Sequence, residues 1–248
     1  MHNFFVNPND IVGNKIRIHE DAGHISRVLR LNIGDKIIVF NGIGGEFHCV
    51  LSEVDKSECI ATIEEIHECA SEPKLKVTLF QGIPKREKME WIIQKCTELG
   101  VSEIYPVITK FTVVKFANEK DKIAKAERWQ KIALEASKQC GRGVVPIVHL
   151  PIPFDESVKK ASQLDSAIMP YEVLALDKKK DFRTCLANNT NCENMGIIIG
   201  PEGGFCESEA KLANANGIDL AGLGARILRT ETAAIAALAI VMYENEEI

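Results

Sequence analysis

The periodicity of the apolar residues changes near residue 70, and this change constrains the fold more than any other feature of the sequence. Before it, runs rich in β-branched residues at 36–40, 46–51 and 58–66 are separated by turn signals such as Gly34-Asp35. That spacing predicts a small antiparallel β-barrel. From residue 75 onward, strand-like and helix-like segments alternate. This pattern predicts an α/β fold with a mostly parallel sheet and helices on both faces.

We therefore predict two domains, 1–72 and 73–248, joined by the proline-containing polar stretch 70–74. In the second domain, apolar residues recur at helical spacing in 87–100 and 127–143. Further helices should begin near Ser208 and Thr230, and the second of these is so apolar that it must be buried on all sides, as it would be in a dimer interface. The expected strands of this domain are 75–80, 103–109, 166–169, 173–176, 196–200 and 219–224.

The charge of the chain is unevenly distributed. Residues 1–72 hold 6 Lys and Arg against 12 Asp and Glu, a local charge of −6, and residues 143–248 also come to −6. Residues 85–142 hold 13 against 8, a local charge of +5 within a chain of net charge −5. Electrostatic recognition is local, so the basic middle segment is a candidate contact for nucleic acid, although the charge pattern alone favours a solvated helical face.

The eight cysteines are scattered, with no C-x-x-C pair. His67 and Cys69 are close in sequence, but no second pair accompanies them, so the sequence predicts no metal site. Scattered thiols and the absence of an N-terminal signal pattern predict a cytoplasmic location.

The stretch GIIIGPEGGF, Gly196–Phe205, predicts a buried strand followed by a glycine-rich loop. Ligands of open α/β sheets bind beyond the carboxyl ends of such strands. Neither G-x-G-x-x-G nor G-x-x-x-x-G-K-[ST] is present, and Glu202 would repel a polyphosphate. S-adenosylmethionine carries a sulfonium and an amino group and no phosphate, so it suits this loop. A tight turn that needs glycine only for its backbone angles is the alternative.

A second unusual segment is LGARILRTETAAIAALAIV at 223–241. It places Arg226, Arg229 and Glu231 directly before the apolar helix, beside the core. Partly buried charges are costly unless they are paired or used. Arg229 and Glu231 therefore form either a structural ion pair or part of a site.

These residues carry a resemblance to a known family. GPEGGF followed by LGARILRTETA is similar to the RsmE family of 16S ribosomal RNA uridine N3-methyltransferases, in the SPOUT superfamily. Stretches at 24–42, 88–101 and 128–142 resemble the same family, in the same order. The chain departs from the family's usual pattern at Arg86, where glycine is usual, and at Ala225, where proline is frequent.

The resemblance implies a PUA-like β-barrel that binds RNA at 1–72 and a SPOUT-type α/β methyltransferase domain with a C-terminal deep trefoil knot at 73–248. It implies S-adenosylmethionine as cofactor, a homodimer in which both subunits build each site, and 16S rRNA or the small ribosomal subunit as partner. The residues it assigns to the cofactor are Tyr171, Glu172, Gly200, Pro201, Glu202, Gly203, Leu223, Gly224, Ile227, Leu228, Thr232 and Ala233.

The chemistry expected from the resemblance is methyl transfer to N3 of a uridine, with Arg229 stabilising developing charge and Glu231 orienting Arg229 or accepting the proton. The RNA contacts are expected from Arg30, Lys85, Arg86, Arg142 and Arg226. Two alternatives remain open: methylation of another RNA position, such as a ribose 2′-O or a tRNA base, and a non-catalytic rRNA-binding assembly factor.

Overall fold

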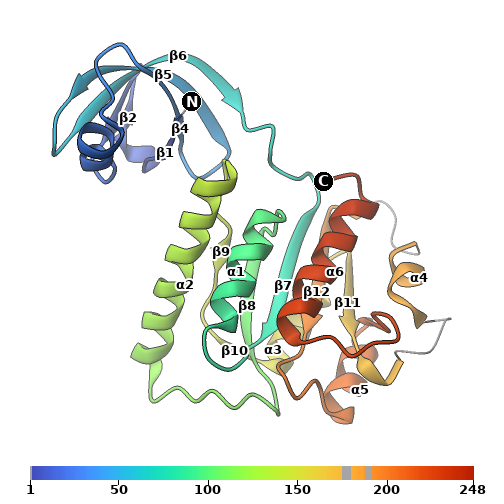
Figure 1. Ribbon diagram of the computed structural model, residues 1–248. Helices are drawn as coiled ribbons and strands as arrows, with labels where there is room; N and C mark the ends of the chain where they lie inside the picture. The colour runs from blue at the N-terminus through green and yellow to red at the C-terminus, as the bar shows by residue number, and fades with distance from the viewer. Residues whose placement is uncertain (1, 175–179, 188–191) are drawn as a thin grey trace. The chain divides into compact units, whose positions relative to one another are not determined.

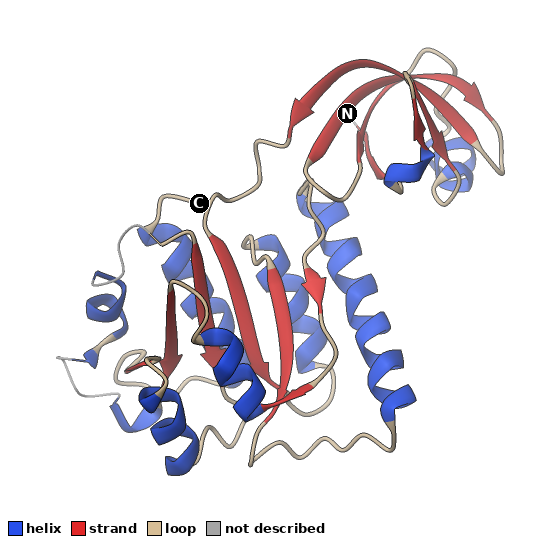
Figure 2. Ribbon diagram, turned by 180° about the vertical axis from the view of Figure 1, so that it is seen from behind, coloured by secondary structure: helices blue, strands red, loops and turns tan. Residues whose placement is uncertain are grey.

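The structure is a computed structural model that describes residues 2–174, 180–187 and 192–248 (Figures 1 and 2). The chain divides into two compact units. The first comprises Met1–Glu72 with Ser137–Val145, and the second comprises Pro73–Ala136 with Pro146–Ile248. The segment 137–145 thus belongs to the first unit. The predicted single boundary between residues 72 and 73 places it in the second domain instead.

The first unit is built on one six-stranded sheet in the order β1-β4-β5-β6-β3-β2. The runs predicted from β-branched residues are confirmed as its β4, β5 and β6. The prediction of a wholly antiparallel sheet is wrong at one edge, because β1 pairs with β4 in parallel. The strands are β1 (His2–Phe5), β2 (Ile11–Val12), β3 (Lys15–Ile18), β4 (Lys36–Phe40), β5 (Gly45–Val54) and β6 (Cys59–Glu68).

The sheet of the first unit curves around its own hydrophobic core (Figure 2). Alternate residues of β5, namely Phe47, Cys49 and Leu51, are buried in that core, while the residues between them face outward. The π-helical turn His24–Leu29 adds Ile25 to the core. Among the described strands, β1 and β2 lie at the two ends of this sheet and are not paired with each other. The predicted barrel is therefore not closed by hydrogen bonds between its first and last strands.

The second unit contains a seven-stranded sheet in which neighbouring strands run parallel, as the alternating pattern predicts. The path is β10-β8-β7-β12-β11-β13, and β9 pairs with β8. The strands are β7 (Lys76–Gly82), β8 (Glu103–Ile108), β9 (Ile147–Val148), β10 (Ile152–Pro153), β11 (Ser166–Pro170), β12 (Asn194–Ile199) and β13 (Asp219–Ala221). The predicted strand at 173–176 is wrong in its described part, because Glu172–Leu174 forms a 3-10 turn; residues 175–176 lie outside the described residues.

Helices cover the sheet of the second unit, and their sequences explain where they begin and end. Helix α1 buries Met89, Ile92, Ile93 and Cys96 on one face and is followed by Gly100 at φ +92. The Glu209 carboxylate accepts a hydrogen bond from the Cys206 amide at 2.9 Å, closing the first turn of α5. The helices are α1 (Lys88–Glu98), α2 (Glu119–Cys140), α3 (Phe154–Ala161), α4 (Phe182–Ala187), α5 (Glu207–Ala215) and α6 (Thr230–Glu244).

Helix α6 begins at Thr230, as predicted, and packs against α1 and the sheet. One side of it, with Ala234, Leu238 and Val241, is fully buried. The prediction that it is buried on all sides is wrong within one chain, because Ile240 is 38% exposed and Tyr243 is 70% exposed. Among the described residues, no helix combines the length and the apolar character needed to cross a membrane.

Candidate active site

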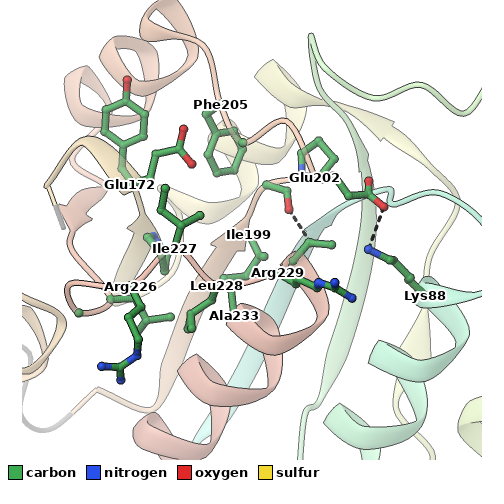
Figure 3. Close-up of a pocket in the computed structure, with 18 residues that line it drawn as sticks. Lys88, Glu172, Ile199, Glu202, Phe205, Arg226, Ile227, Leu228, Arg229 and Ala233 are labelled. Carbon is green, nitrogen blue, oxygen red and sulfur yellow. Dashed lines mark hydrogen bonds and ion pairs between the residues drawn. The ribbon is translucent and has the colours of Figure 1, made fainter.

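A pocket of about 340 Å³ lies in the second unit where β11 and β12 end (Figure 3). Its walls come mainly from three segments that are distant in sequence: the turn after β11, the loop after β12, and the stretch that leads into α6. Lys88, at the start of α1, adds a fourth. The lining residues are Lys88, Pro170, Tyr171, Glu172, Ile199, Gly200, Pro201, Glu202, Gly204, Phe205, Leu223, Gly224, Arg226, Ile227, Leu228, Arg229, Thr230 and Ala233. The pocket therefore occupies the position at which parallel α/β sheets bind ligands.

The glycines of the loop after β12 are required by close approaches. A Cβ on Gly200 would lie 3.0 Å from the Cα of Gly204, so a side chain there would press against the returning backbone of the loop. Gly204 has φ +65, and a Cβ there would lie 3.3 Å from both carboxylate oxygens of Glu172. Gly82, at the end of β7, leaves room for Pro201, since a Cβ would meet the Pro201 ring at 2.5 Å. These glycines bring backbone to the wall of the pocket.

A buried hydrogen-bond chain fixes this loop to α6 and β7. The Thr230 hydroxyl donates to the Gly200 carbonyl at 2.6 Å and accepts from the Gln81 side-chain amide at 2.9 Å. The same amide donates to the Gly82 carbonyl at 2.8 Å. Because Gln81 is 0% exposed and Thr230 is 5% exposed, water cannot replace these partners.

A cluster of three charges forms one edge of the pocket. The Lys88 ammonium lies 3.3 Å from a Glu202 oxygen (Figure 3) and 3.1 Å from a Glu231 oxygen. Burial opposes ionisation of Glu202, but its own amide, the Lys85 amide and the Lys88 ammonium outweigh burial, so its pKa lies below the usual value. Burial likewise opposes the charge on Lys88, yet the carboxylates of Glu231 and Glu202 outweigh it and raise the pKa of the lysine.

The pairing predicted between Arg229 and Glu231 is not found, because the Glu231 carboxylate pairs with Lys88. Within the described part of the chain, Arg229 has no ion-pair partner; it is exposed and lines the pocket from the residue that precedes α6. The predicted role of Glu231 in orienting Arg229 therefore lacks structural support. Arg226, which was expected to contact RNA, also lines the pocket.

The structure brings ten of the twelve predicted cofactor residues to the pocket wall: Tyr171, Glu172, Gly200, Pro201, Glu202, Leu223, Gly224, Ile227, Leu228 and Ala233. Gly203 and Thr232 are not among the lining residues. A Cβ on Gly203 would meet the Cβ of Phe111 at 2.8 Å, so this glycine makes room for a neighbouring side chain. Thr232 is exposed in the first turn of α6.

The predicted RNA contacts differ in their exposure. Lys85 and Arg86 are exposed on the loop between β7 and α1, and Arg30 is exposed in the first unit. Arg142 is 4% exposed, and its Nη2 donates to a Glu72 oxygen at 2.8 Å. The prediction that Arg142 contacts RNA is therefore corrected: a guanidinium buried in an ion pair is not accessible to phosphate, and it stabilises the first unit instead.

Sequence reasoning missed several residues of the site. Gln81 and Lys88 lie more than 100 residues before the loop that they hold, and nothing in their local sequence marks them. Thr230 and Phe205 lie inside the two sequence stretches 223–241 and 196–205, which are unusual in the sequence. Their position in these motifs could have marked them, but neither was given an individual role in the site.

The fold and the site together define the class of protein: a parallel α/β domain with a small-molecule pocket, linked to a small β unit. A family model described as an RNA methyltransferase domain matches residues 71–242, and one described as an RNA methyltransferase PUA domain matches residues 20–64. The chain is 37% identical to the ribosomal RNA small subunit methyltransferase E of Bacillus subtilis (strain 168), over 92% of this chain and 89% of that protein. The corresponding protein of Mesomycoplasma hyopneumoniae (strain 232) is 34% identical, over 95% and 96%. The chain belongs to the family of ribosomal RNA small subunit methyltransferases E.

Solved structures agree with this assignment. A crystal structure of the ribosomal RNA small subunit methyltransferase E from Neisseria gonorrhoeae bound to S-adenosyl methionine matches with a TM-score of 0.83 at 30% identity, over 98% of each chain. A Legionella pneumophila protein in complex with the same cofactor matches with a TM-score of 0.83 at 32% identity, over 98% of this chain and 97% of that one. The predicted fold class, an α/β methyltransferase domain with an N-terminal PUA-like domain, is confirmed; the trefoil knot stays a prediction.

The residues of the pocket fit S-adenosylmethionine. The volume lies within the roughly 300–1,000 Å³ of small-molecule sites. Ile199, Leu228 and Phe205 offer apolar surface to an adenosine, and the Glu172 carboxylate offers a negative charge to a sulfonium or an amino group. Side chains at Gly200 or Gly204 would crowd the loop that forms the wall.

Proposed function

We propose that this protein transfers the methyl group of S-adenosylmethionine to N3 of a uridine in the RNA of the small ribosomal subunit. The observation that carries the proposal is the pocket at the ends of β11 and β12, which combines apolar walls, glycine-dependent backbone and the Glu172 carboxylate. Membership of the family and the cofactor-bound structures of its relatives support the same conclusion.

The chemistry requires a uracil whose N3 proton leaves as the new bond forms. The bound cofactor would supply an electrophilic methyl group, whose bond to sulfur breaks as the bond to N3 forms, leaving S-adenosylhomocysteine, while the N3 proton passes to solvent. Arg229 is exposed at the pocket and has no ion-pair partner among the described residues, so its guanidinium is free to approach the O2 or O4 of the base. We assign to it the stabilisation of negative charge on the uracil, because a planar, permanently charged fork suits adjacent acceptors.

Lys88 has a positioning role in this proposal. Its ammonium group sits between Glu202, on the loop after β12, and Glu231, in the first turn of α6. Each carboxylate belongs to a segment that lines the pocket. The Lys88 ammonium group therefore fixes the distance between the loop after β12 and the first turn of α6. The amide of Lys85 supports the same loop by donating to a Glu202 oxygen at 3.1 Å.

The substrate RNA would be held by exposed cations. Lys85 and Arg86 lie on the loop next to the charge cluster, and Arg226 lies at the pocket itself. Arg30 is exposed on the first unit, which resembles PUA domains of RNA methyltransferases. Such contacts go to phosphates and fix the position of the RNA without reading its sequence. The target base must leave its stack to reach a pocket of this kind.

A second copy of the chain is the partner we propose for α6. The exposed side of this helix carries Ile240 and Tyr243, which border an apolar groove of about 480 Å³ together with Phe182 and Ile248. An exposed apolar surface of this kind is typical of subunit interfaces. Sedimentation equilibrium of the wild type and of Tyr243→Glu tests the proposal, and a wild-type monomer would overturn it. We also propose a cytoplasmic location, which the scattered positions of the cysteines in the sequence favour.

The function is tested by incubating the purified chain with S-adenosylmethionine carrying a labelled methyl group and with small ribosomal subunits from a strain that lacks this modification. We expect label in the rRNA and N3-methyluridine in its nucleoside digest. Label in a ribose 2′-O-methyl nucleoside, or in tRNA only, would replace the proposed specificity with another. Binding to rRNA without any transfer of label would favour the non-catalytic assembly factor.

A further inference from the structure

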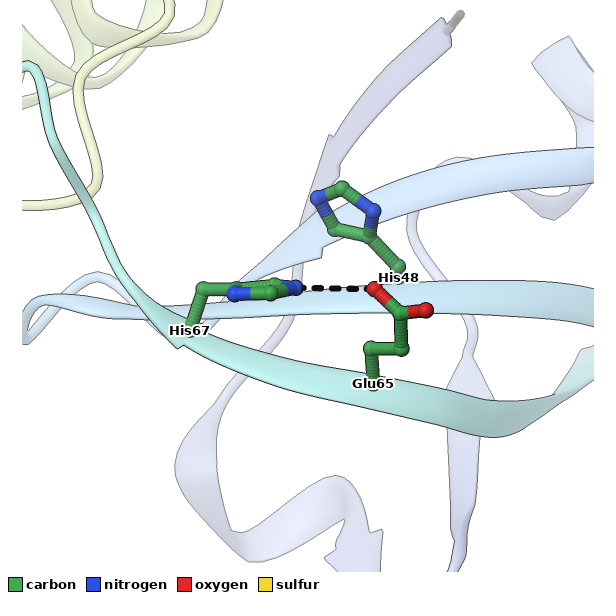
Figure 4. A group of neighbouring side chains, drawn as sticks. All are labelled: His48, Glu65 and His67. Carbon is green, nitrogen blue, oxygen red and sulfur yellow. Dashed lines mark hydrogen bonds and ion pairs between the residues drawn. The ribbon is translucent and has the colours of Figure 1, made fainter.

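Two histidines and a glutamate meet on the surface of the first unit (Figure 4). His48 lies on β5, and Glu65 and His67 lie on β6. One potential ligand atom from each lies within 4.8 Å of the others. The Nε2 of His67 is 3.0 Å from a Glu65 oxygen, and the rings of His48 and His67 are 4.7 Å apart between centroids.

The strand register explains why these side chains share one face of the sheet. His48 pairs with Glu65, and its second neighbour Glu46 pairs with His67. The register shifts between His48 and Cys49, where Glu64 of β6 has no paired residue. Without this extra residue the alternation of β6 would send Glu65 and His67 to the opposite face, and the bulge therefore assembles the cluster.

Glu46 prepares one of the histidines for a further partner. Its Oε1 lies 2.8 Å from the Nε2 of His48, and the two side chains are only 20% and 33% exposed. When His48 is neutral and donates its Nε2 proton to this carboxylate, Nδ1 carries the lone pair. A carboxylate that accepts a hydrogen bond from the second nitrogen of a histidine is a common support of metal-binding imidazoles.

We propose that His48, Glu65 and His67 bind a divalent transition-metal ion of the Zn²⁺ type, with Glu46 orienting His48. Two imidazoles and one carboxylate suit Zn²⁺, whereas Mg²⁺ and Ca²⁺ prefer oxygen ligands throughout. Ligand atoms around a tetrahedral ion with bonds of about 2.1 Å lie roughly 3.4 Å apart. The Glu65–His67 separation already meets this requirement, and small side-chain rotations bring His48 to it.

Three protein ligands leave a fourth position open to water or to another molecule. The site belongs to the first unit alone, so it does not depend on the pocket or on the proposed methyl transfer. The competing explanation is two surface pairs of histidine and glutamate, one within β5 and one within β6, which hold no ion and contribute little to stability. The sequence left His67 without a second histidine nearby, and in the structure that histidine comes from the neighbouring strand. Cys69 is buried and does not belong to the cluster.

The test is a calorimetric titration of the full chain with Zn²⁺, and separately with Ni²⁺, after treatment with a chelator and desalting. We expect one saturable site in the wild type that is lost in His48→Asn/His67→Asn. Glu46→Gln changes only the support of His48, so it should weaken the site roughly 10–100-fold. The matched control is His19→Asn: His19 pairs with Glu58 at 3.5 Å in the same unit, outside the cluster.

Any Zn²⁺ bound by thiols elsewhere in the chain is the same in every variant, because the cysteines are unchanged, so only the difference between variants reports on the cluster. Circular dichroism and thermal unfolding of the ion-free variants establish that they remain folded. Equal Zn²⁺ affinity in the wild type and the double histidine variant would overturn the proposal. An equal loss in His19→Asn, or no saturable binding by the wild type, would also overturn it.

Discussion

Thr230→Val tests whether one buried hydroxyl holds the pocket loop in place. Valine matches threonine in shape, so the change opens no cavity, and it removes only the hydroxyl group. The Gly200 carbonyl then loses its donor at 2.6 Å, and the Gln81 amide loses an acceptor at 2.9 Å while it keeps the Gly82 carbonyl. Each buried group left without a partner costs about 1–3 kcal/mol. Since the amide retains one bond, we expect a total loss of about 3 kcal/mol.

This loss should lower the unfolding temperature of the second unit by roughly 6–12 °C, at about 2–4 °C per kcal/mol for a unit of this size. Both tryptophans, Trp91 and Trp129, belong to the second unit, so tryptophan fluorescence follows the unfolding of that unit. A released Gly200 carbonyl also disturbs the pocket wall. We expect S-adenosylmethionine to bind about 5–30-fold more weakly, which corresponds to a loss of about 1–2 kcal/mol.

Thr232→Val is the matched control, because it makes the same chemical change two residues further along α6 at an exposed position. It should unfold within about 1 °C of the wild type, since surface substitutions are usually within about 0.5 kcal/mol. If Thr230→Val is as stable as Thr232→Val, the hydrogen-bond chain does not stabilise the site and the reasoning fails.

Three further predictions concern catalysis, the cofactor and RNA. Arg229→Lys keeps the charge but loses the planar arrangement of donors. Single-turnover methyl transfer, with S-adenosylmethionine and RNA both saturating, should therefore fall about 10²–10³-fold, while the affinities for the two ligands change little. A wild-type rate would show that Arg229 has no role in the chemical step. Gly204→Ala should weaken cofactor binding in calorimetry because its Cβ would approach a pocket carboxylate at 3.3 Å, whereas Gly217→Ala, with φ +80 and open space, should carry the same backbone strain without that effect. Reversing the charges of Lys85 and Arg86 should weaken RNA binding and flatten its dependence on salt, because fewer counterions are released; an unchanged salt slope would leave these residues as solvated surface.

Local sequence was sufficient to predict the features that depend only on neighbouring residues. The three isoleucines before Gly200 predict β12 because a strand in the middle of a parallel sheet is apolar on both faces. The start of α6 at Thr230 follows from the change from charged to apolar residues along a few positions. The glycines after β12 predict a close approach of backbone, and the order of motifs along the chain indicates the family.

Contacts between distant segments could be decided only by the tertiary structure. The sequence places Arg229 two residues from Glu231 and suggests that they pair, yet a lysine on α1, more than 100 residues earlier, provides the partner of Glu231. Arg142 looks like a free cation in a basic segment, but the return of 137–145 to the first unit buries it against Glu72. The residues around a cation do not indicate which carboxylate from a distant segment will lie beside it in the folded protein.

The histidine cluster also depends on a contact between two segments, in this case the pairing of β5 with β6. Period-two alternation assigns each residue of β6 to a face, and one unpaired residue at Glu64 reverses that assignment for everything beyond it. The sequence predicted a strand over 58–66, which ends one residue before His67, and the structure extends β6 to Glu68. Only the register with β5 determined that His48 would meet His67, because a bulge is fixed by the pairing of two strands and not by either strand alone.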